Sequence, residues 1–164
     1  MPVAIRSARP GDAAAIAAIY NEGIEERTST FETALRSAAD VEDWLRGKKR
    51  LPVLVADHDG MVVGWARIQP YSDREAYAGV GEASVYVRTT ARGRGLGSRL
   101  LTELAAGARE LGYWKLTGKL FTGNAASRAL VERCGWREVG THLRHGRLDG
   151  DWRDVIVVEV LLGA

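Results

Sequence analysis

The spacing of apolar residues near the start of the chain predicts a strand followed by two helices. Residues 3–8 alternate apolar and polar side chains as a strand does. Residues 9–26 follow a Pro-Gly-Asp helix start with apolar residues at helical spacing. A polar loop separates them from a second helix at 37–50, in which Ser37 is placed as the N-cap.

The later apolar runs predict a hairpin, two strand-helix units and a second hairpin. Residues 51–71 hold two strand-like runs around Asp59-Gly60, a pair that favours a tight turn because Gly tolerates a positive φ. The Val/Ile/Leu-rich final strand is expected to be buried on both faces. The remaining strands are predicted at 82–90, 114–121, 136–148 and 151–162, and the helices at 96–113 and 124–136.

This order of elements is typical of a single α+β or mixed α/β domain. The chain has 164 residues, of which 46% are hydrophobic, enough for one compact core. No repeat or low-complexity linker divides it. We therefore expect one domain over residues 1–164, with a sheet covered by helices.

Charge and composition limit the classes of partner. The chain has 23 Lys and Arg against 21 Asp and Glu, and a net charge of +2 does not favour a polyanion such as DNA. The N-terminal segment lacks a signal-peptide pattern and no apolar run reaches about 20 residues, so we expect a cytoplasmic protein without membrane contact. The single cysteine, Cys134, lies in no Cys/His set with metal-ligand spacing and is interpreted as a small buried side chain; no metal is expected.

A glycine-rich, arginine-rich stretch lies directly before the helix predicted at 96–113. A helix start exposes free backbone N–H groups, and Gly93, Gly95 and Gly97 would let a bulky anion reach them, with Arg92 and Arg94 adding charge. A solvated glycine-rich turn is the plain alternative. The spacing and position do not fit a dinucleotide-binding Rossmann motif, and the lysine of a P-loop is absent. The stretch predicts a phosphate or pyrophosphate site.

Residues 83–101 resemble the acyl-CoA-binding core of the GNAT N-acetyltransferases, whose signature is Arg/Gln-x-x-Gly-x-Gly/Ala after a strand. Arg92, Gly95 and Gly97 fill that signature, and residues 123–136 match the family's second segment, which runs from Asn to Gly-aromatic. The order of elements is also that of the family. The resemblance implies the GNAT fold, a mostly antiparallel twisted sheet of about seven strands flanked by four helices.

The resemblance also implies acetyl-CoA as co-substrate. Backbone groups of the strand would hold the pantetheine arm as a peptide is held at a strand edge, and amides of the glycine-rich stretch would hold the pyrophosphate. The residues implied in this binding are Val85, Tyr86, Val87, Arg92, Gly93, Arg94, Gly95, Leu96, Gly97, Ser98 and Asn124.

Acetyl transfer to an amine needs a base, because an ammonium nitrogen cannot attack. Glu82 starts the signature strand and shares a face with Ser84 and Tyr86, so we predict it as the general base; a solvated strand-end carboxylate is the alternative. A strand amide near Tyr86 would stabilise the oxyanion. Val131 stands where many members have a Tyr, and it cannot donate a proton to the leaving thiolate.

Within the family, three segments are similar to the phosphinothricin and methionine sulfoximine acetyltransferase branch: 19–33, 69–77 and 146–162. That branch implies a small amino-acid-like amine as substrate and a homodimer. Arg74 and Tyr77 match its Arg-x-x-Tyr, and an arginine binds a carboxylate in bidentate fashion. The residues predicted to bind the substrate are Thr28, Phe31, Arg74 and Tyr77.

Several alternatives remain open at this point. His142 and His145 are candidates for the border of the substrate cleft. The same fold could acetylate a protein N-terminus or lysine, or the chain could be a non-catalytic acyl-CoA-binding or nucleic-acid-binding domain. Five tryptophans lie on separate predicted elements, a scatter that predicts core packing: Trp44, Trp65, Trp114, Trp136 and Trp152.

Overall fold

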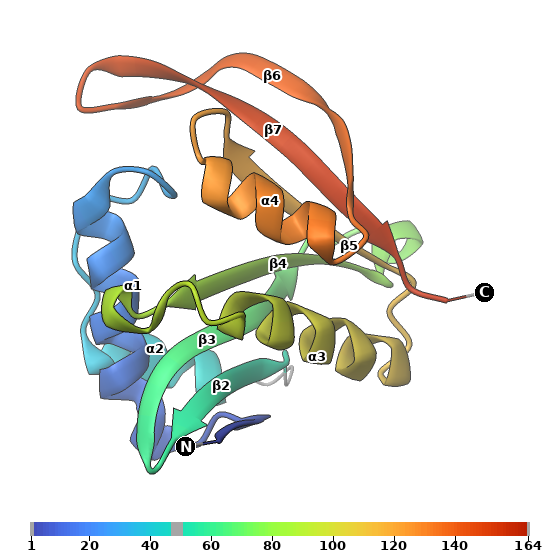
Figure 1. Cartoon of the computed structure of the whole chain (residues 1–164). Helices are drawn as coiled ribbons and strands as arrows, with labels where there is room; N and C mark the ends of the chain where they lie inside the picture. Colours follow the sequence, from blue (N-terminus) through green and yellow to red (C-terminus); the bar gives the residue numbers. More distant parts are fainter. Residues whose placement is uncertain (1, 47–50, 164) are drawn as a thin grey trace.

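The computed structural model describes residues 2–46 and 51–163, and within them a seven-stranded sheet is flanked by four α-helices (Figure 1). The strands are β1 (Val3–Ser7), β2 (Val53–His58), β3 (Met61–Pro70), β4 (Val80–Val87), β5 (Lys115–Phe121), β6 (Arg137–Leu148) and β7 (Asp151–Leu161). The helices are α1 (Ala13–Glu26), α2 (Ala38–Arg46), α3 (Leu96–Glu110) and α4 (Ala125–Arg133), with 3-10 turns η1 (Pro10–Asp12), η2 (Glu75–Tyr77) and η3 (Thr89–Ala91). The predicted mixed α/β fold and its element order are confirmed.

The strand order is β1-β2-β3-β4-β5-β7-β6, and every neighbouring pair is antiparallel except β4 and β5. That parallel pair is short, since it covers only Val80–Glu82 of β4 and Lys115–Thr117 of β5. The two strands then part, and Figure 1 shows α4 beside the opening, below the long β6–β7 hairpin. The sheet is therefore split near its middle, and β4, which carries Glu82 and Val85–Val87, forms one edge of the split.

Helices cover both faces of the sheet and create two main cores. Helix α3 contacts β2, β3 and β4 on one face, where Leu100 and Leu104 are fully buried. Helices α1 and α2 pack together on the other face over β3 and β4, where Ile16, Ile19 and Val41 are buried. The apolar positions that predicted these helices are thus the positions that face the sheet.

The final strand is buried on both faces at its centre, as predicted. Ile156 and Val158 join the core beneath α3, whereas Val155 packs on the opposite face with Phe121 and Leu148. Strand β7 lies between β5 and β6 in the sheet, so both of its hydrogen-bonding edges are occupied. Burial of both faces explains the aliphatic run from Val155 to Val158.

Local features agree closely with the sequence. The turns at Asp59-Gly60 and Asp149-Gly150 have positive φ at both residues, as the hairpin prediction requires. Ser37 caps α2, because its Oγ accepts a hydrogen bond of 3.2 Å from the Asp40 amide. The predicted helix at 37–50 is described as far as Arg46, and residues 47–50 lie outside the described ranges.

The tryptophan prediction is partly wrong. Trp65 and Trp136 are buried, and Trp44 packs against the core, but Trp114 and Trp152 are about half exposed. Trp114 lies over Gly79, where no Cβ would fit, and Trp152 lies beneath the guanidinium of Arg147 at 4.2 Å. A flat aromatic ring can cover backbone or a cation at the surface, so scatter along the sequence does not by itself indicate burial. Cys134 is partly buried at the end of α4, close to the expected environment.

Among the described helices, none combines the length and apolar character needed to cross a bilayer.

Candidate active site

The glycine-rich stretch forms the open entrance to α3. Gly93 and Gly95 have φ values of 79° and 78°, a region that residues with a Cβ rarely adopt. Gly97 lies in the first turn, and a Cβ there would be 3.2 Å from Leu130 of α4. No side chain caps the helix start, so its first amides are free to bind an anion. The start of α3 is thus open, and that it binds an anion stays a prediction.

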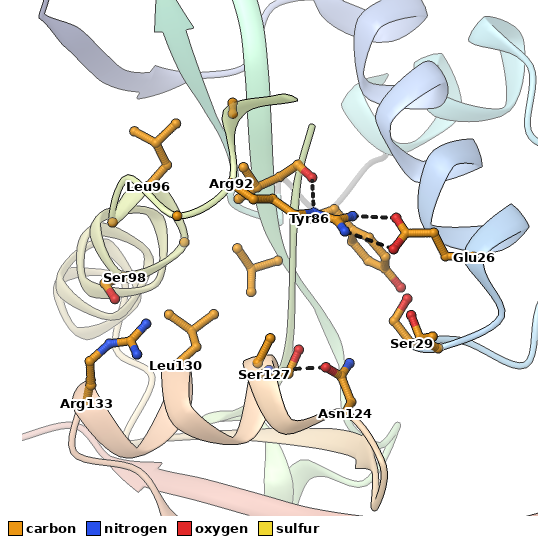
Figure 2. Close-up of a pocket in the computed structure, with 18 residues that line it drawn as sticks. Glu26, Ser29, Tyr86, Arg92, Leu96, Ser98, Asn124, Ser127, Leu130 and Arg133 are labelled. Atoms are coloured by element: carbon orange, nitrogen blue, oxygen red, sulfur yellow. Dashed lines mark hydrogen bonds and ion pairs between the residues drawn. The ribbon is translucent and has the colours of Figure 1, made fainter. Parts of the chain in front are cut away.

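A cavity of about 530 Å³ lies in front of this helix start, between α3, α4 and the end of β4 (Figure 2). Of the eleven residues predicted to bind acetyl-CoA, Arg94 alone does not line it; Arg94 is exposed on the loop. Thr28, which we predicted on the substrate side, also lines this cavity. The predicted residues it brings together are Thr28, Val85, Tyr86, Val87, Arg92, Gly93, Gly95, Leu96, Gly97, Ser98 and Asn124.

Arg92 differs from the expectation that it offers its guanidinium to an anion. Its guanidinium binds Glu26 of α1 through two nitrogens, one at 2.8 Å, and its Nε donates to the Val87 carbonyl at 3.2 Å (Figure 2). The hydrogen bond to Glu26 raises the pKa of Arg92 above its usual value. A second anchor lies beside it, where Glu22 accepts hydrogen bonds from the amide and hydroxyl of Thr89. These contacts fasten the loop to α1.

Helix α4 supplies residues that the sequence analysis did not identify. Ser127, Leu130 and Arg133 line the cavity, and Figure 2 shows Arg133 near the start of α3. They follow Asn124 at intervals of three residues, which places them on one side of the helix. That spacing was the available signal. Asn124 itself caps α4 through its Oδ1, which accepts from the Ser127 amide at 3.2 Å and leaves its Nδ2 available to a ligand.

The end of β4 has an open edge toward the cavity. Val85, Tyr86 and Val87 pair with β3 on one side, whereas the pairing with β5 ends at Glu82. Main-chain groups beyond Glu82 are therefore free on the side of the split. An extended molecule with amide groups can bind such an edge as an added strand does.

A second cavity, of about 500 Å³, lies on the α1 side of the same split and contains Glu82. The Glu82 side chain is 29% exposed, and its carboxylate lies 3.5 Å from the ammonium of Lys119 on β5. Phe31 contacts Phe121 edge to face with ring centroids 4.7 Å apart, and both line this cavity. Glu82 is thus a wall residue of a cleft rather than a fully solvated strand end.

Tyr86 lines both cavities. Its ring stacks between Tyr20 and Trp65, at centroid distances of 5.1 and 5.0 Å. Burial raises the pKa of Tyr86 to about 12, so the phenol stays protonated at neutral pH. The aromatic cluster holds β4 in place directly beside the open edge.

The other predicted substrate residues are not gathered at this cavity in the described chain. Arg74 and Tyr77 lie on the exposed turn η2, where Tyr77 contacts Tyr71, and neither lines the two cavities. His145 does line the Glu82 cavity, and its ring stacks on His142 at 4.3 Å. Val131 is buried in the core, as an aliphatic residue at that position requires.

Residues 16–136 match the model of the acetyltransferase (GNAT) family. The chain belongs to this family. The L-methionine sulfoximine/L-methionine sulfone acetyltransferase of Pseudomonas paraeruginosa is 34% identical over 99% of this chain and 96% of its own length. The ribosomal-protein-alanine N-acetyltransferase structure from Brucella melitensis is 37% identical, with a TM-score of 0.92, and covers 97% of this chain and 99% of its own.

A solved GNAT phosphinothricin acetyltransferase from Sinorhizobium meliloti, in complex with acetyl-CoA, has a TM-score of 0.91. It is 29% identical, and the match covers 99% of this chain and 90% of that one. The predictions of a GNAT N-acetyltransferase and of similarity to the phosphinothricin and methionine sulfoximine branch are confirmed. Similarity at this level extends over nearly the whole chain.

Proposed function

We propose that this GNAT enzyme transfers the acetyl group of acetyl-CoA to the amino group of a small amino-acid-like substrate. The observation that carries the proposal is the arrangement of the two cavities. Tyr86 and Ser29 line both cavities, so a thioester at the open edge of β4 would meet an amine that enters past Glu82. The relatives named for phosphinothricin and methionine sulfoximine support the substrate class.

The residues present fit acetyl-CoA in both shape and chemistry. The glycine-rich entrance leaves space where any other residue would place a Cβ, and the first amides of α3 suit the pyrophosphate. Arg133 adds a positive charge at the same end of the cavity. The free edge at Val85–Val87 suits the two amides of pantetheine.

Direct attack is the proposed reaction. Glu82 accepts a proton from the substrate ammonium, and the free amine attacks the thioester carbonyl carbon. A backbone amide near Tyr86 or Val87 donates to the oxyanion. The new C–N bond forms, the C–S bond breaks, and the second amine proton passes to solvent. The thiolate leaves unaided and is protonated by water, since a thiol pKa near 8.5 makes it a competent leaving group.

A screen for thiol release tests the proposed substrate class. The enzyme with acetyl-CoA would be offered phosphinothricin, methionine sulfoximine, common amino acids, polyamines and short peptides. We expect release with free amino-acid analogues. Activity on peptides alone would remove the small-molecule assignment.

Acetylation of a protein N-terminus is the second candidate, and the match to the ribosomal-protein-alanine N-acetyltransferase favours it. It predicts release with peptides that begin with alanine and none with free amino acids. We further propose a cytoplasmic homodimer, as the branch implies, and sedimentation equilibrium at micromolar concentration tests the dimer.

A further inference from the structure

The parting of β4 and β5 brings Lys119 into the Glu82 cavity. Glu82 pairs with Thr117, the last residue of β5 that pairs with β4, and Lys119 follows Thr117 by two positions on the same face of the strand. The ammonium of Lys119 reaches back across the split to within 3.5 Å of the Glu82 carboxylate. The two groups therefore face each other where the substrate amine must bind.

Lys119 is the single Lys or Arg among the described residues that line this cavity. Its side chain is 53% exposed, and its one described ion pair, to Glu82, is longer than a tight hydrogen bond. The ammonium has three donors, so donors remain for a second acceptor. Lys115, on the same face of β5, differs because it is tightly paired with Glu159.

No described arginine lines this cavity, although the Cζ of Arg153 lies 5.7 Å from the ring centroid of Phe121. Arg36 is bound to Glu32 at 2.8 Å, so the negative charge of that cavity residue is already neutralised. Arg67 lies over the ring of Trp44 at 3.4 Å and does not line the cavity. Arg74, the cation that the sequence predicted for the substrate's acid group, lies on exposed η2.

An α-amino acid carries its ammonium and its carboxylate on one carbon atom, so the two charges are as close together as Glu82 and Lys119 are. Such a zwitterion can direct its ammonium to Glu82 and its carboxylate to Lys119 at the same time. Its side chain then extends toward Phe31 and Phe121, which form an apolar part of the cavity. An amine without an adjacent acid group leaves Lys119 without this new partner.

We propose that Lys119 binds the carboxylate of the substrate and so selects α-amino acids over simple amines and amides. The inference deepens the proposed function and rests on it. Lys119 is a specificity residue in this scheme, since it touches the substrate away from the bond that forms.

A matched pair of substrates distinguishes carboxylate binding by Lys119 from a general effect of Lys119 on activity. Wild-type enzyme and Lys119→Met would be assayed with L-methionine sulfoximine and with its α-carboxamide, which lacks the negative charge. We expect KM for the acid to rise roughly tenfold or more, as for the loss of a charge-assisted hydrogen bond, and KM for the amide to change less than about twofold. Each substrate is compared with itself across variants, so the different basicities of the two amines cancel.

Two further variants serve as controls, and a third, Arg74→Met, tests the competing cation. Lys119→Arg keeps the charge and is expected to retain most of the preference for the acid. Lys115→Met removes a lysine from the same face of β5 outside the cavity and is expected to leave the acid-to-amide ratio unchanged. Acetyl-CoA affinity, measured by calorimetry, verifies that each variant is folded.

The outcomes are distinct. Equal losses for acid and amide in Lys119→Met, or no loss for either, overturn the role of Lys119 while the proposed function stands. If Arg74→Met changes the acid-to-amide ratio of KM and Lys119→Met does not, the substrate carboxylate is assigned to Arg74, and the role of Lys119 is overturned. Wild-type enzyme that acetylates no free amino acid in the wider screen overturns the proposed function itself, and this inference with it.

Discussion

Replacing Gly95 with alanine tests whether the left-handed backbone before α3 holds the anion-binding loop in shape. Gly95 has a φ of 78°, and a Cβ there would meet no heavy atom within 4 Å beyond its chain neighbours. Steric clash therefore does not contribute, and the cost is that of the left-handed conformation, about 1–2 kcal/mol. For a chain of this length, the Tm is expected to fall by roughly 2–8 °C.

Gly107→Ala is the matched control. Gly107 lies within α3, a Cβ there also meets nothing within 4 Å, and its φ is not in the left-handed region. Alanine at this position is expected to raise the free energy of unfolding by about 0.5–1 kcal/mol. Urea unfolding of both variants measures whether the free energy of unfolding falls for Gly95→Ala and rises for Gly107→Ala. Equal stability of Gly95→Ala and wild type would refute the backbone argument.

The same pair of variants tests the acetyl-CoA site. If the loop relaxes to relieve the strain at residue 95, its amides move away from the pyrophosphate, and we expect affinity for acetyl-CoA to fall roughly tenfold, as for one lost charge-assisted hydrogen bond. Gly107→Ala should bind as wild type does. Calorimetry provides the affinities. Lost stability with unchanged affinity would show that these amides do not hold the pyrophosphate.

Three further substitutions test other parts of the mechanism and the fold. Glu82→Gln should lower kcat by about 10²–10⁴-fold and leave acetyl-CoA affinity nearly unchanged, because it removes the proposed general base, which lies outside the cavity proposed for acetyl-CoA. Equal losses would count against the base. Glu26→Gln should change the free energy of unfolding by less than about 1 kcal/mol, because the ion pair between Glu26 and Arg92 is exposed. The same variant should bind acetyl-CoA more tightly, because it releases Arg92 and removes a negative charge from the cavity. Calorimetry that shows weaker binding would contradict this. Hydrogen bonds from Arg6 hold the pKa of Asp12 below its usual range. The stability that this carboxylate contributes is therefore complete above its unfolded pKa, near 3.9, and is lost as the pH falls through the lower folded pKa. Urea unfolding from about pH 6 to about pH 2 should show a smaller loss of unfolding free energy for Asp12→Asn than for wild type.

The sequence predicted the elements well because each has a strong local signal. The hairpin turns carry Asp-Gly pairs, α2 begins at a serine cap, and the glycine-rich stretch requires positive φ at Gly93 and Gly95. These features depend on residues within a few positions of one another. Local chemistry decides them, and the fold does not override it.

The contacts of the site depend on residues far apart in the chain and were not predictable in the same way. From the sequence, Arg92 is predicted to bind an anion, but in the fold its guanidinium binds Glu26, which lies 66 positions earlier in the chain. In the sequence, Lys119 is only a polar residue within a strand, whereas in the fold β4 and β5 part and Lys119 lies opposite Glu82. In both cases the partner is set by topology, which apolar periodicity does not specify.

Residue 131 shows how packing constrains the chemistry of the site. Val131 is buried in one cluster with Leu101 and Trp136, so it supplies packing for α4 and no proton donor. In the proposed reaction the departing thiolate depends on its own acidity, whereas the incoming amine still has to lose a proton before it attacks. The need for acid-base catalysis is therefore on the amine side of the split. Glu82 and Lys119 form a charged pair on that side, which is why substrate choice and catalysis are expected to depend on neighbouring residues.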